Sequence, residues 1–367
     1  MRIAIDARMI NYTGIGRYTQ NLIASLARLD VVDLTVLRDD EPPQGAGIGR
    51  RVKFRKPTFS IPVYSMKEHI LLPLEMKMTG ADLFHYPSFN MPLVNPRPSV
   101  VTIHDLVYYL DQAACPGKMA HLYARLVFRK VAGAAKRILT LSEYTKKDIV
   151  EHLGVHHDKV VVTYPGVDEF YRPERESASL DRVRKRYSID GDYVLYVGNH
   201  GVNKNLHRLL NAFAGLKNRK STVLILAGKT DPRRQDLYNL PSSLGVEDRV
   251  RFIGKVPEED LPALYTMAKV FVFPSLYEGF GLPPLEAMAC GAPVVASTAT
   301  SLPEAVGDAG VLADPFDAGA IAGALDKVLS SKALQSELRE KGIKRAGRFS
   351  WLECAKKTVE VYREALQ

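Results

Sequence analysis

The sequence predicts an α/β protein with two doubly wound parallel sheets. Short β-branched segments alternate with amphipathic helical segments from end to end of the 367 residues, which is the pattern of successive βαβ units. A polar stretch without strand periodicity, residues 168–192, separates two such series. With 46% hydrophobic residues, the chain is also too long for one ordinary core. We therefore expect two domains, residues 1–172 and 190–349.

The elements follow in order from the N-terminus. In the first domain we expect strands at 3–7, 33–37, 82–87, 99–105, 137–142 and 160–164, and helices at 16–29, 65–79, 118–135 and 143–153. In the second domain we expect strands at 193–198, 223–228, 250–254, 270–275, 293–297 and 310–314. Helical segments at 316–330, 332–347 and 350–366 close the chain. The second sheet needs only some of these helices to cover its faces. Residues 350–367 are therefore expected to cross back and complete the first domain.

The chain carries a net charge of +9, and its first half is the more basic. Residues 1–172 contain 23 Lys and Arg against 17 Asp and Glu. Basic residues gather at 50–56 and 125–137, where they either meet anionic lipid head groups, phosphates or nucleic acid, or form a solvated face. Motifs that combine clustered aromatic and basic side chains for base stacking are missing from the sequence, so nucleic-acid binding is not expected.

The sequence has no features of a secreted or membrane-spanning protein. The N-terminus "MRIAIDARMI" lacks the apolar segment of a signal peptide, and no run approaches the roughly 18 apolar residues of a membrane span. Its three cysteines, Cys115, Cys290 and Cys354, suit a reducing compartment. We expect a cytoplasmic protein. Residues 61–80 mix apolar and basic side chains, which indicates either a half-buried helix or a peripheral contact with the inner face of a membrane.

A loop after the strand at 270–275 combines carboxylates with features that bind anions. Gly279 and Gly281 let main-chain N–H groups approach a ligand, and prolines at 283–284 suit the first turn of a helix. Such a helix start favours a diphosphate. We place Glu286 in the same first turn and Glu278 in the loop before it. Each carboxylate could accept hydrogen bonds from sugar hydroxyls. Ordinary helix capping, or the acid and base of a glycoside hydrolase, are the alternatives.

Other candidate residues also follow predicted strands. Lys204 is expected at the start of a helix after the first strand of the second domain, where it either reaches a phosphate or is merely solvated. Gly14 and Gly16 are interpreted as a flexible loop before a helix, and Arg17 as a phosphate or acceptor ligand or a helix-edge residue. His104 ends a buried strand, where an imidazole hydrogen-bonds a sugar, shuttles a proton, or is simply a core residue. No HExxH motif is present, so no metal is expected.

Four segments together resemble the retaining glycosyltransferases of family 4, which have the GT-B fold of two Rossmann-like domains around a cleft. They are "PSLYEGFGLPPLEAMACGAPVVAS", "YVGNHGVNKNLHRLLNAF", "VRFIGKVPEEDLPALY" and "DARMINYTGIGRYTQNL", and the resemblance covers essentially the whole chain. It implies an acceptor-binding first domain and a donor-binding second domain. Many members carry an arginine just after the "VG" of the second segment, where this chain has Asn199 and His200. A second phosphate cation is therefore in doubt unless Arg17 or His200 supplies it.

The resemblance also implies a role for each matching position. Glu278 and His104 would contact the transferred sugar, Glu286 the ribose, and Lys204 the diphosphate. The remaining positions would act through their backbone or border a ligand: the amides of Phe280, Gly281 and Leu282 at the sugar and diphosphate, Lys255 and Val256 at the base, and Gly14 to Gly16 at the acceptor. Such enzymes generally need no metal or other cofactor, since lysine and helix amides replace the cation.

We therefore expect a metal-independent, retaining hexosyltransferase. It would move a hexose, with mannose favoured by the wording of "TGIGRY" and "NKNL", from GDP-mannose or a UDP-hexose to a glycan or lipid-linked acceptor. Two alternatives remain open at this point. One is a GT-B-like sugar-nucleotide epimerase, which would convert the donor without any acceptor; the other is a non-catalytic protein that binds an anionic ligand.

Overall fold

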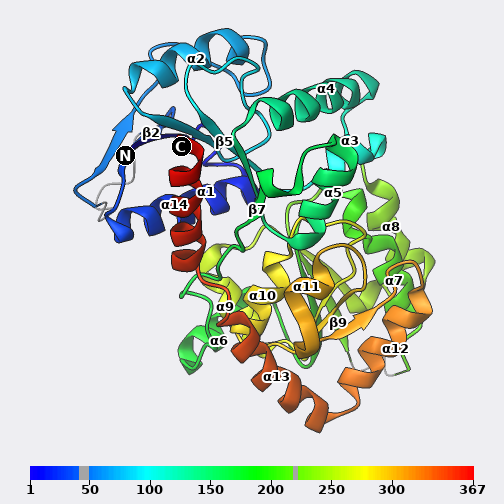
Figure 1. The fold of residues 1–367 in the computed structure, drawn as a ribbon. Coiled ribbons are helices and arrows are strands. Elements are labelled where there is room, and N and C mark those ends of the chain that lie inside the picture. The colour runs from blue at the N-terminus through cyan, green and yellow to red at the C-terminus, as the bar shows by residue number, and fades with distance from the viewer. Residues whose placement is uncertain (41–48, 218–221) are drawn as a thin grey trace. The chain divides into compact units, whose positions relative to one another are not determined.

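The computed structural model of the protein describes residues 1–40, 49–217 and 222–367. It divides the chain into two compact units. Unit 1 joins Met1–Gly166 with Ser350–Gln367, and unit 2 is Val167–Phe349. The C-terminal segment therefore returns to the unit that holds the N-terminus, and the predicted crossing is confirmed (Figure 1).

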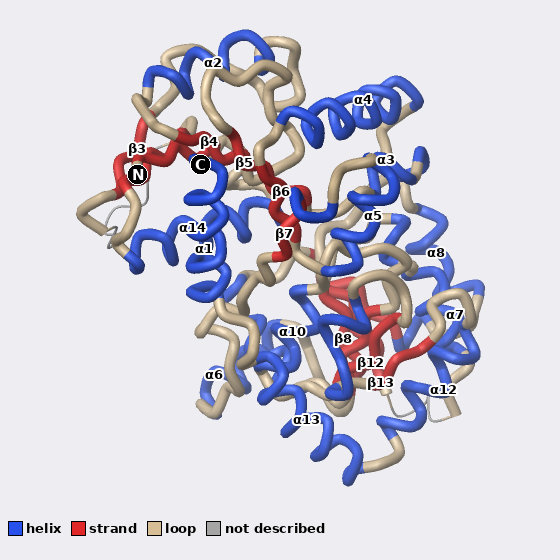
Figure 2. The backbone as a smooth tube through the Cα atoms, viewed as in Figure 1, coloured by secondary structure: helices blue, strands red, loops and turns tan. Residues whose placement is uncertain are grey.

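Unit 1 is built on a parallel sheet with the strand order β3-β2-β1-β4-β5-β6-β7. Every residue of β4 and β5 is buried, as expected for a parallel sheet with helices on both faces. Figure 2 shows these strands in red with helices around them. The strands are β1 Arg2–Asp6, β2 Asp33–Leu37, β3 Val52–Arg55, β4 Leu83–Tyr86, β5 Ser99–Ile103, β6 Arg137–Thr140 and β7 Val160–Val162.

The helices of unit 1 cover this sheet, and the last helix of the chain packs against the first. The hydroxyl of Tyr362 lies 2.6 Å from Nδ1 of His85 on β4, which ties the C-terminal helix to the centre of the sheet. The indole of Trp351 meets the ring of Tyr18 edge-on. The helices are α1 Thr13–Leu29, α2 Glu68–Met78, α3 Val107–Leu110, α4 Lys118–Ala134, α5 Glu143–Leu153 and α14 Trp351–Leu366, with short 3-10 turns at Gln112–Ala114 and His157–Lys159.

Unit 2 repeats the plan with the strand order β10-β9-β8-β11-β12-β13, again parallel throughout. Its strands are β8 Tyr193–Val197, β9 Val223–Ala227, β10 Val250–Gly254, β11 Val270–Phe273, β12 Val294–Ser297 and β13 Val311–Ala313. Its helices are α6 Ser177–Arg186, α7 Leu206–Ala214, α8 Gln235–Ser243, α9 Leu261–Met267, α10 Leu282–Ala289, α11 Leu302–Val306, α12 Ala318–Leu329 and α13 Lys332–Ala346. Short 3-10 turns lie at Val202–Lys204, Glu247–Arg249, Glu258–Asp260 and Gly307–Ala309.

Two segments contain elements that were not predicted from the sequence. The polar stretch 168–192 contains helix α6, which buries Val183 and is anchored by ion pairs from Arg182 and Arg186 to the buried Asp260. The basic run at 50–56 contains the edge strand β3, paired with β2 alone. Both segments carry many charges because one face of each is exposed, and this hides their periodicity.

The strand order changes direction at one place in each sheet. In unit 1 this switch lies between β1 and β4, and in unit 2 between β8 and β11. Loops that follow such strands diverge to opposite sides of the sheet and leave a crevice, which is where open α/β sheets bind ligands. Within the described residues, no helix combines the length and apolar character that crossing a bilayer requires.

The buried His85 makes the stability of unit 1 depend on pH. Burial, with a smaller contribution from His104, lowers the pKa of His85 to about 3. Between the ordinary pKa of about 6.5 and this value, the unfolded chain binds a proton that the folded chain does not, so stability falls by up to about 1.4 kcal/mol per pH unit as the pH drops.

We expect His85→Gln to lower the melting temperature at pH 7 but to reduce the further loss between pH 7 and pH 5, measured by circular dichroism. The exposed His157→Gln is the control and should keep the wild-type pH dependence. An undiminished loss in His85→Gln would contradict the assignment.

Candidate active site

The two charged residues predicted from different segments meet at the switch point of unit 2. Lys204 ends the 3-10 turn after β8, two residues before α7 begins, and Glu278 lies in the loop after β11. The ammonium nitrogen Nζ of Lys204 lies 2.5 Å from Oε1 of Glu278. Both side chains are about one-seventh exposed, at 13% and 14%. The same ammonium group lies over the ring of Phe273, 5.6 Å from its centroid.

Asn205 holds the loops around this pair together. Its side-chain Nδ2 donates to the carbonyls of Pro274 (3.0 Å) and Pro315 (2.7 Å), which follow β11 and β13. Its Oδ1 accepts from Nη1 of Arg208 at 3.1 Å, which fixes the orientation of the amide. Asn205 itself has φ 61°, a left-handed conformation that asparagine tolerates better than most residues. One buried side chain thus joins three post-strand loops.

The loop that carries Glu278 is fixed by further hydrogen bonds. The main-chain N–H of Glu278 donates to Oγ1 of Thr300 at 3.1 Å. The hydroxyl of Ser301 lies 2.9 Å from the carbonyl of Glu278 and 3.0 Å from that of Phe280. On the other side, Nδ2 of Asn203 donates to the carbonyl of Tyr277 at 3.2 Å. The carboxylate is therefore held on a rigid turn.

Two main-chain N–H groups beside this turn have no acceptor. Among the described residues, the N–H groups of Gly281 and Leu282 form no hydrogen bond, although Gly281 is buried. They precede Pro283 and Pro284 at the start of α10, which have no N–H of their own. Gly281 has φ 110°, and a Cβ there would lie 2.6 Å from Cδ2 of Leu302. Buried donors of this kind normally have partners, so their position favours an anionic ligand.

Glu286 lies one turn further into α10 than predicted. Because the helix begins at Leu282, Glu286 is in its second turn, and no acidic residue lies in the first. Its side chain is 3% exposed, and the hydroxyl of Tyr265 donates to its Oε2 at 3.3 Å. The side chain of Phe280 is buried against Phe349, so only its backbone is available to a ligand.

Two other loops of unit 2 carry further predicted residues. Lys255 and Val256 were predicted to contact the nucleotide base, and His200 lies where the resemblance leads us to expect an arginine. Lys255 and Val256 directly follow β10, with Lys255 exposed and Val256 buried. His200 is 1% exposed, and its Nδ1 lies 3.0 Å from the hydroxyl of Tyr238. Burial and the charge of Arg234 lower its pKa. Its lowered pKa favours the neutral imidazole, so the geometry gives His200 no support as the second phosphate cation.

The remaining predicted residues belong to unit 1. Gly14 and Gly16 are not in a loop, because α1 begins at Thr13; Gly16 packs so closely on the carbonyl of Ile10 that a Cβ would collide with it. Arg17 lies one residue later in the same helix and is half-buried. Nε2 of His104 lies 2.7 Å from the carbonyl of Pro87, and burial lowers the pKa of His104 to about 4. It is thus a neutral ring whose Nε2 donates, which leaves Nδ1 as the acceptor.

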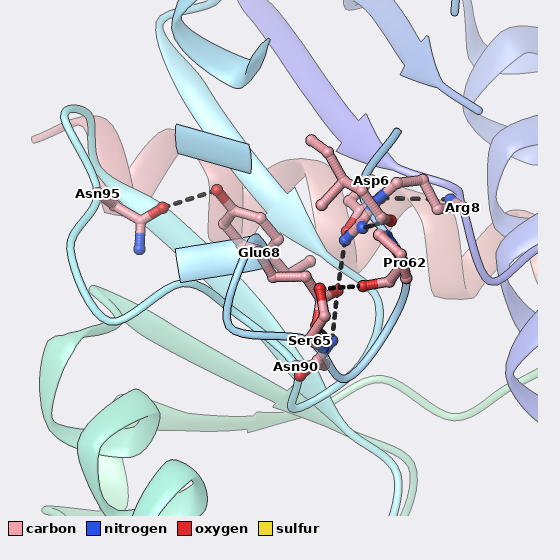
Figure 3. A network of polar contacts seen from close by, with 9 residues as sticks. Asp6, Arg8, Pro62, Ser65, Glu68, Asn90 and Asn95 are labelled. Carbon is pink, nitrogen blue, oxygen red and sulfur yellow. Dashed lines mark hydrogen bonds and ion pairs between the residues drawn. The ribbon is translucent and has the colours of Figure 1, made fainter. Parts of the chain in front are cut away.

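The switch point of unit 1 is filled by its own side chains (Figure 3). The guanidinium of Arg8, whose side chain is 1% exposed, donates to Asp6 at 2.7 Å and to Glu68 at 2.9 Å. Nδ2 of Asn90, from the loop after β4, contacts both oxygens of Glu68. Burial raises the pKa of Glu68 against these hydrogen bonds. Removing one member of such a buried cluster typically costs about 3–5 kcal/mol.

The comparisons with known proteins match both units. The model of "Glycosyltransferase Family 4" matches residues 12–169, and that of "Glycosyl transferases group 1" matches residues 181–345. O-antigen chain mannosyltransferase B of Escherichia coli is 33% identical over 99% of this chain and 100% of its own length. The chain belongs to glycosyltransferase family 4. It is a glycosyltransferase, and the epimerase alternative is not favoured.

Solved structures agree on the fold of this family 4 member. The Anabaena protein HepE in complex with UDP and glucose matches with a TM-score of 0.80 at 20% identity, over 99% of this chain and 100% of that one. Sucrose-phosphate synthase from Thermosynechococcus elongatus matches with a TM-score of 0.78 at 22% identity, over 99% and 98%. The predicted GT-B class, with its Rossmann-like parallel sheets, is confirmed.

Three residues that support this site were not predicted from the sequence. They are Asn203, Asn205 and Ser301. Each donates a hydrogen bond to a main-chain carbonyl of a neighbouring loop, so each supports the site without contacting a ligand itself. The signal available was the pair of asparagines that flanks Lys204 in "VNKNL". Asparagine is common where a turn needs both a left-handed residue and a side-chain hydrogen bond.

Asn205→Asp should test the role of the three-loop contact. The carboxylate keeps the shape of the amide but replaces its N–H donors with acceptors that face two carbonyls, so about 1–3 kcal/mol of stability should be lost. We expect a lower melting temperature of the protein and weaker nucleotide binding by calorimetry. Asn211→Asp, on the exposed face of α7, is the control; an equal effect there would contradict the role.

Proposed function

We propose that the protein transfers a hexose, with mannose favoured, from a nucleotide diphosphate sugar such as GDP-mannose or a UDP-hexose to a glycan or lipid-linked acceptor. The support for mannose and a glycan acceptor is the relative named as an O-antigen chain mannosyltransferase. The observation that carries the donor assignment is that the N–H groups of Gly281 and Leu282 have no acceptor among the described residues and lie three and four residues after Glu278, the partner of Lys204. Together they offer two dipolar donors and one cation to a diphosphate.

In this proposal Lys204 changes partner when the donor binds. The ammonium group pairs with Glu278 in the unliganded protein, and a diphosphate would draw it away. Glu278 would then accept hydrogen bonds from the hydroxyls of the sugar, and Glu286 from the ribose. As the bond between C1 of the sugar and the phosphate oxygen breaks, negative charge grows on that oxygen, where these donors stabilise it.

We further propose that the anomeric configuration is retained. Glu286 is buried and accepts from Tyr265, and Glu278, once Lys204 has left it, would be occupied by the hydroxyls of the sugar, which disfavours either as a covalent nucleophile. The acceptor hydroxyl would form its bond to C1 on the face that the leaving group departs from. Its proton would pass to the departing phosphate. His104, a neutral acceptor at Nδ1, would orient a sugar hydroxyl rather than supply a proton.

Substitutions at the donor site should separate binding from transfer. Lys204→Ala should lower kcat by about 10²–10³-fold, because a charge that stabilises the leaving group is lost. Glu286→Ala should weaken nucleotide binding, measured by calorimetry with GDP and UDP. Lys344→Ala, on the exposed side of α13, is the matched control. Unchanged turnover in both site variants, with normal melting temperatures, would overturn the assignment.

The reaction should also proceed without a divalent metal ion. Because lysine and main-chain N–H groups supply the positive potential, EDTA should leave the initial rate of mannose transfer unchanged, measured by release of the nucleoside diphosphate. Restoration of activity by Mg²⁺ after complete loss in EDTA would contradict this part of the proposal while leaving the donor site intact.

A further inference from the structure

Tyr64, in the segment between β3 and α2, has a backbone conformation that a bulky residue rarely adopts. Its φ is 61°, in the left-handed region, where a large side chain is an outlier. Such a conformation persists only where the surrounding structure imposes it, and it is concentrated at ligand sites. The residue is nevertheless 44% exposed, so the packing of the core does not explain why a tyrosine stands here.

The buried cluster of Arg8 and Glu68 imposes this conformation from the inside. Nη1 of Arg8 donates to the carbonyl of Ile61 at 2.9 Å. The main-chain N–H of Ser65 donates to Oε2 of Glu68 at 3.2 Å, and its hydroxyl donates to the carbonyl three residues earlier at 2.6 Å (Figure 3). The chain is thus held on both sides of Tyr64 by two charged side chains that are each 1% exposed.

The ring of Tyr64 lies on a column of aromatic rings. Its centroid is 6.0 Å from that of Phe89, in the loop after β4, and the two rings are tilted by 31°. Phe89 in turn stacks on Phe128 of α4, with centroids 4.1 Å apart and an interplanar angle of 17°. Phe128 belongs to the core of unit 1. Tyr64 is therefore the outermost of three rings that rest on the core.

Two more exposed tyrosines lie near Tyr64. Tyr12 follows β1 and Tyr108 follows β5, and they are 47% and 42% exposed. Burial raises the pKa of Tyr64, and the phenols of Tyr108 and Tyr12 raise it further, as expected when the three hydroxyl groups lie near one another. Because the carboxyl ends of parallel strands meet at one edge of a sheet, the three tyrosines gather at the edge where open α/β sheets bind ligands.

Polar atoms without partners flank Phe89 in the chain. Among the described residues, Oγ of Ser88 and Oδ1 of Asn90 are buried and form no hydrogen bond. The two residues are 6% and 4% exposed. Nδ2 of Asn90 contacts both oxygens of Glu68, which leaves its Oδ1 as an unused acceptor. Buried polar atoms normally have a partner, so these two indicate that the loop after β4 has hydrogen bonds to offer a ligand.

We propose that Tyr64 is a platform for a sugar ring of the acceptor. A pyranose has a face of C–H groups, which packs on an aromatic ring, and an edge of hydroxyls, which both donate and accept hydrogen bonds. Tyr64 supplies the aromatic surface, and the hydroxyls of Tyr12 and Tyr108 and the unpartnered atoms of Ser88 and Asn90 supply the polar groups around it. The inference rests on the proposed function and narrows its acceptor to one that presents a sugar to unit 1.

The test is the binding of methyl α-D-mannopyranoside to the full chain in the presence of GDP, measured by saturation-transfer difference NMR. Tyr64→Gly removes the ring at a φ that glycine adopts without strain, so the melting temperature should be kept. The dissociation constant of the mannoside should rise at least about tenfold, because the stacking surface is lost. Tyr64→Phe keeps that surface and should bind the mannoside within about threefold of the unchanged chain.

Ser188→Gly is the matched control. Ser188 is also exposed and left-handed, with φ 52°, but it belongs to unit 2. Its substitution should leave mannoside binding unchanged. In the transfer assay, Tyr64→Gly should raise the KM for a mannoside acceptor and leave the KM for the nucleotide sugar unchanged, a separation that a merely structural role would not produce.

Three results would overturn the inference: no mannoside binding by the unchanged chain, equal binding by Tyr64→Gly, or an equal loss of GDP binding in that variant. Binding of octyl but not methyl α-D-mannopyranoside would also overturn it, because the ring would then hold an alkyl chain. Failure of the proposed function is a separate result. Tyr64-dependent mannoside binding without release of GDP from GDP-mannose or of UDP from a UDP-hexose would remove the transfer reaction and keep the sugar platform.

Discussion

The candidate donor site in unit 2 is held together by the hydrogen bonds of one buried amide, that of Asn205. Asn205 binds the carbonyls of Pro274 and Pro315 and so fixes the loops after β11 and β13 against the turn after β8. The residue before it, Lys204, is thereby placed against Glu278. The loops after β8 and β11 are also joined by the contact of Asn203 with Tyr277, but among the hydrogen bonds of the described residues only the amide of Asn205 reaches the loop after β13 as well.

The loops at the switch points of the two sheets are held by different sets of side chains. In unit 1 the loops after β1 and β4 are joined by Arg8, Asp6, Glu68 and Asn90, which are linked by ion pairs and hydrogen bonds. In unit 2 the corresponding space keeps donors without acceptors, next to a single ion pair. Two sheets with similar topology thus differ in how the side chains at their switch points are paired.

Much of this architecture could be predicted because parallel strands have a strong sequence signal. The short runs rich in aliphatic and aromatic residues at β4, β5 and β11 predict strands, and their order along the chain predicts that the residues after them converge. What failed depends on local detail. The start of α10 at Leu282 moves Glu286 into the second turn, and the start of α1 at Thr13 removes the expected loop at Gly14. The contact between Lys204 and Glu278 follows from Asn205, whose tertiary bonds leave no periodic trace.

The position of α14 has a consequence for how the molecule is made. Its Tyr362 reaches His85 at the centre of the first sheet, yet this helix is translated after the whole of unit 2. Unit 2 is encoded without interruption and has all its strands before then. The unit whose synthesis begins first is thus the unit that must wait, partly assembled, until α14 has been made.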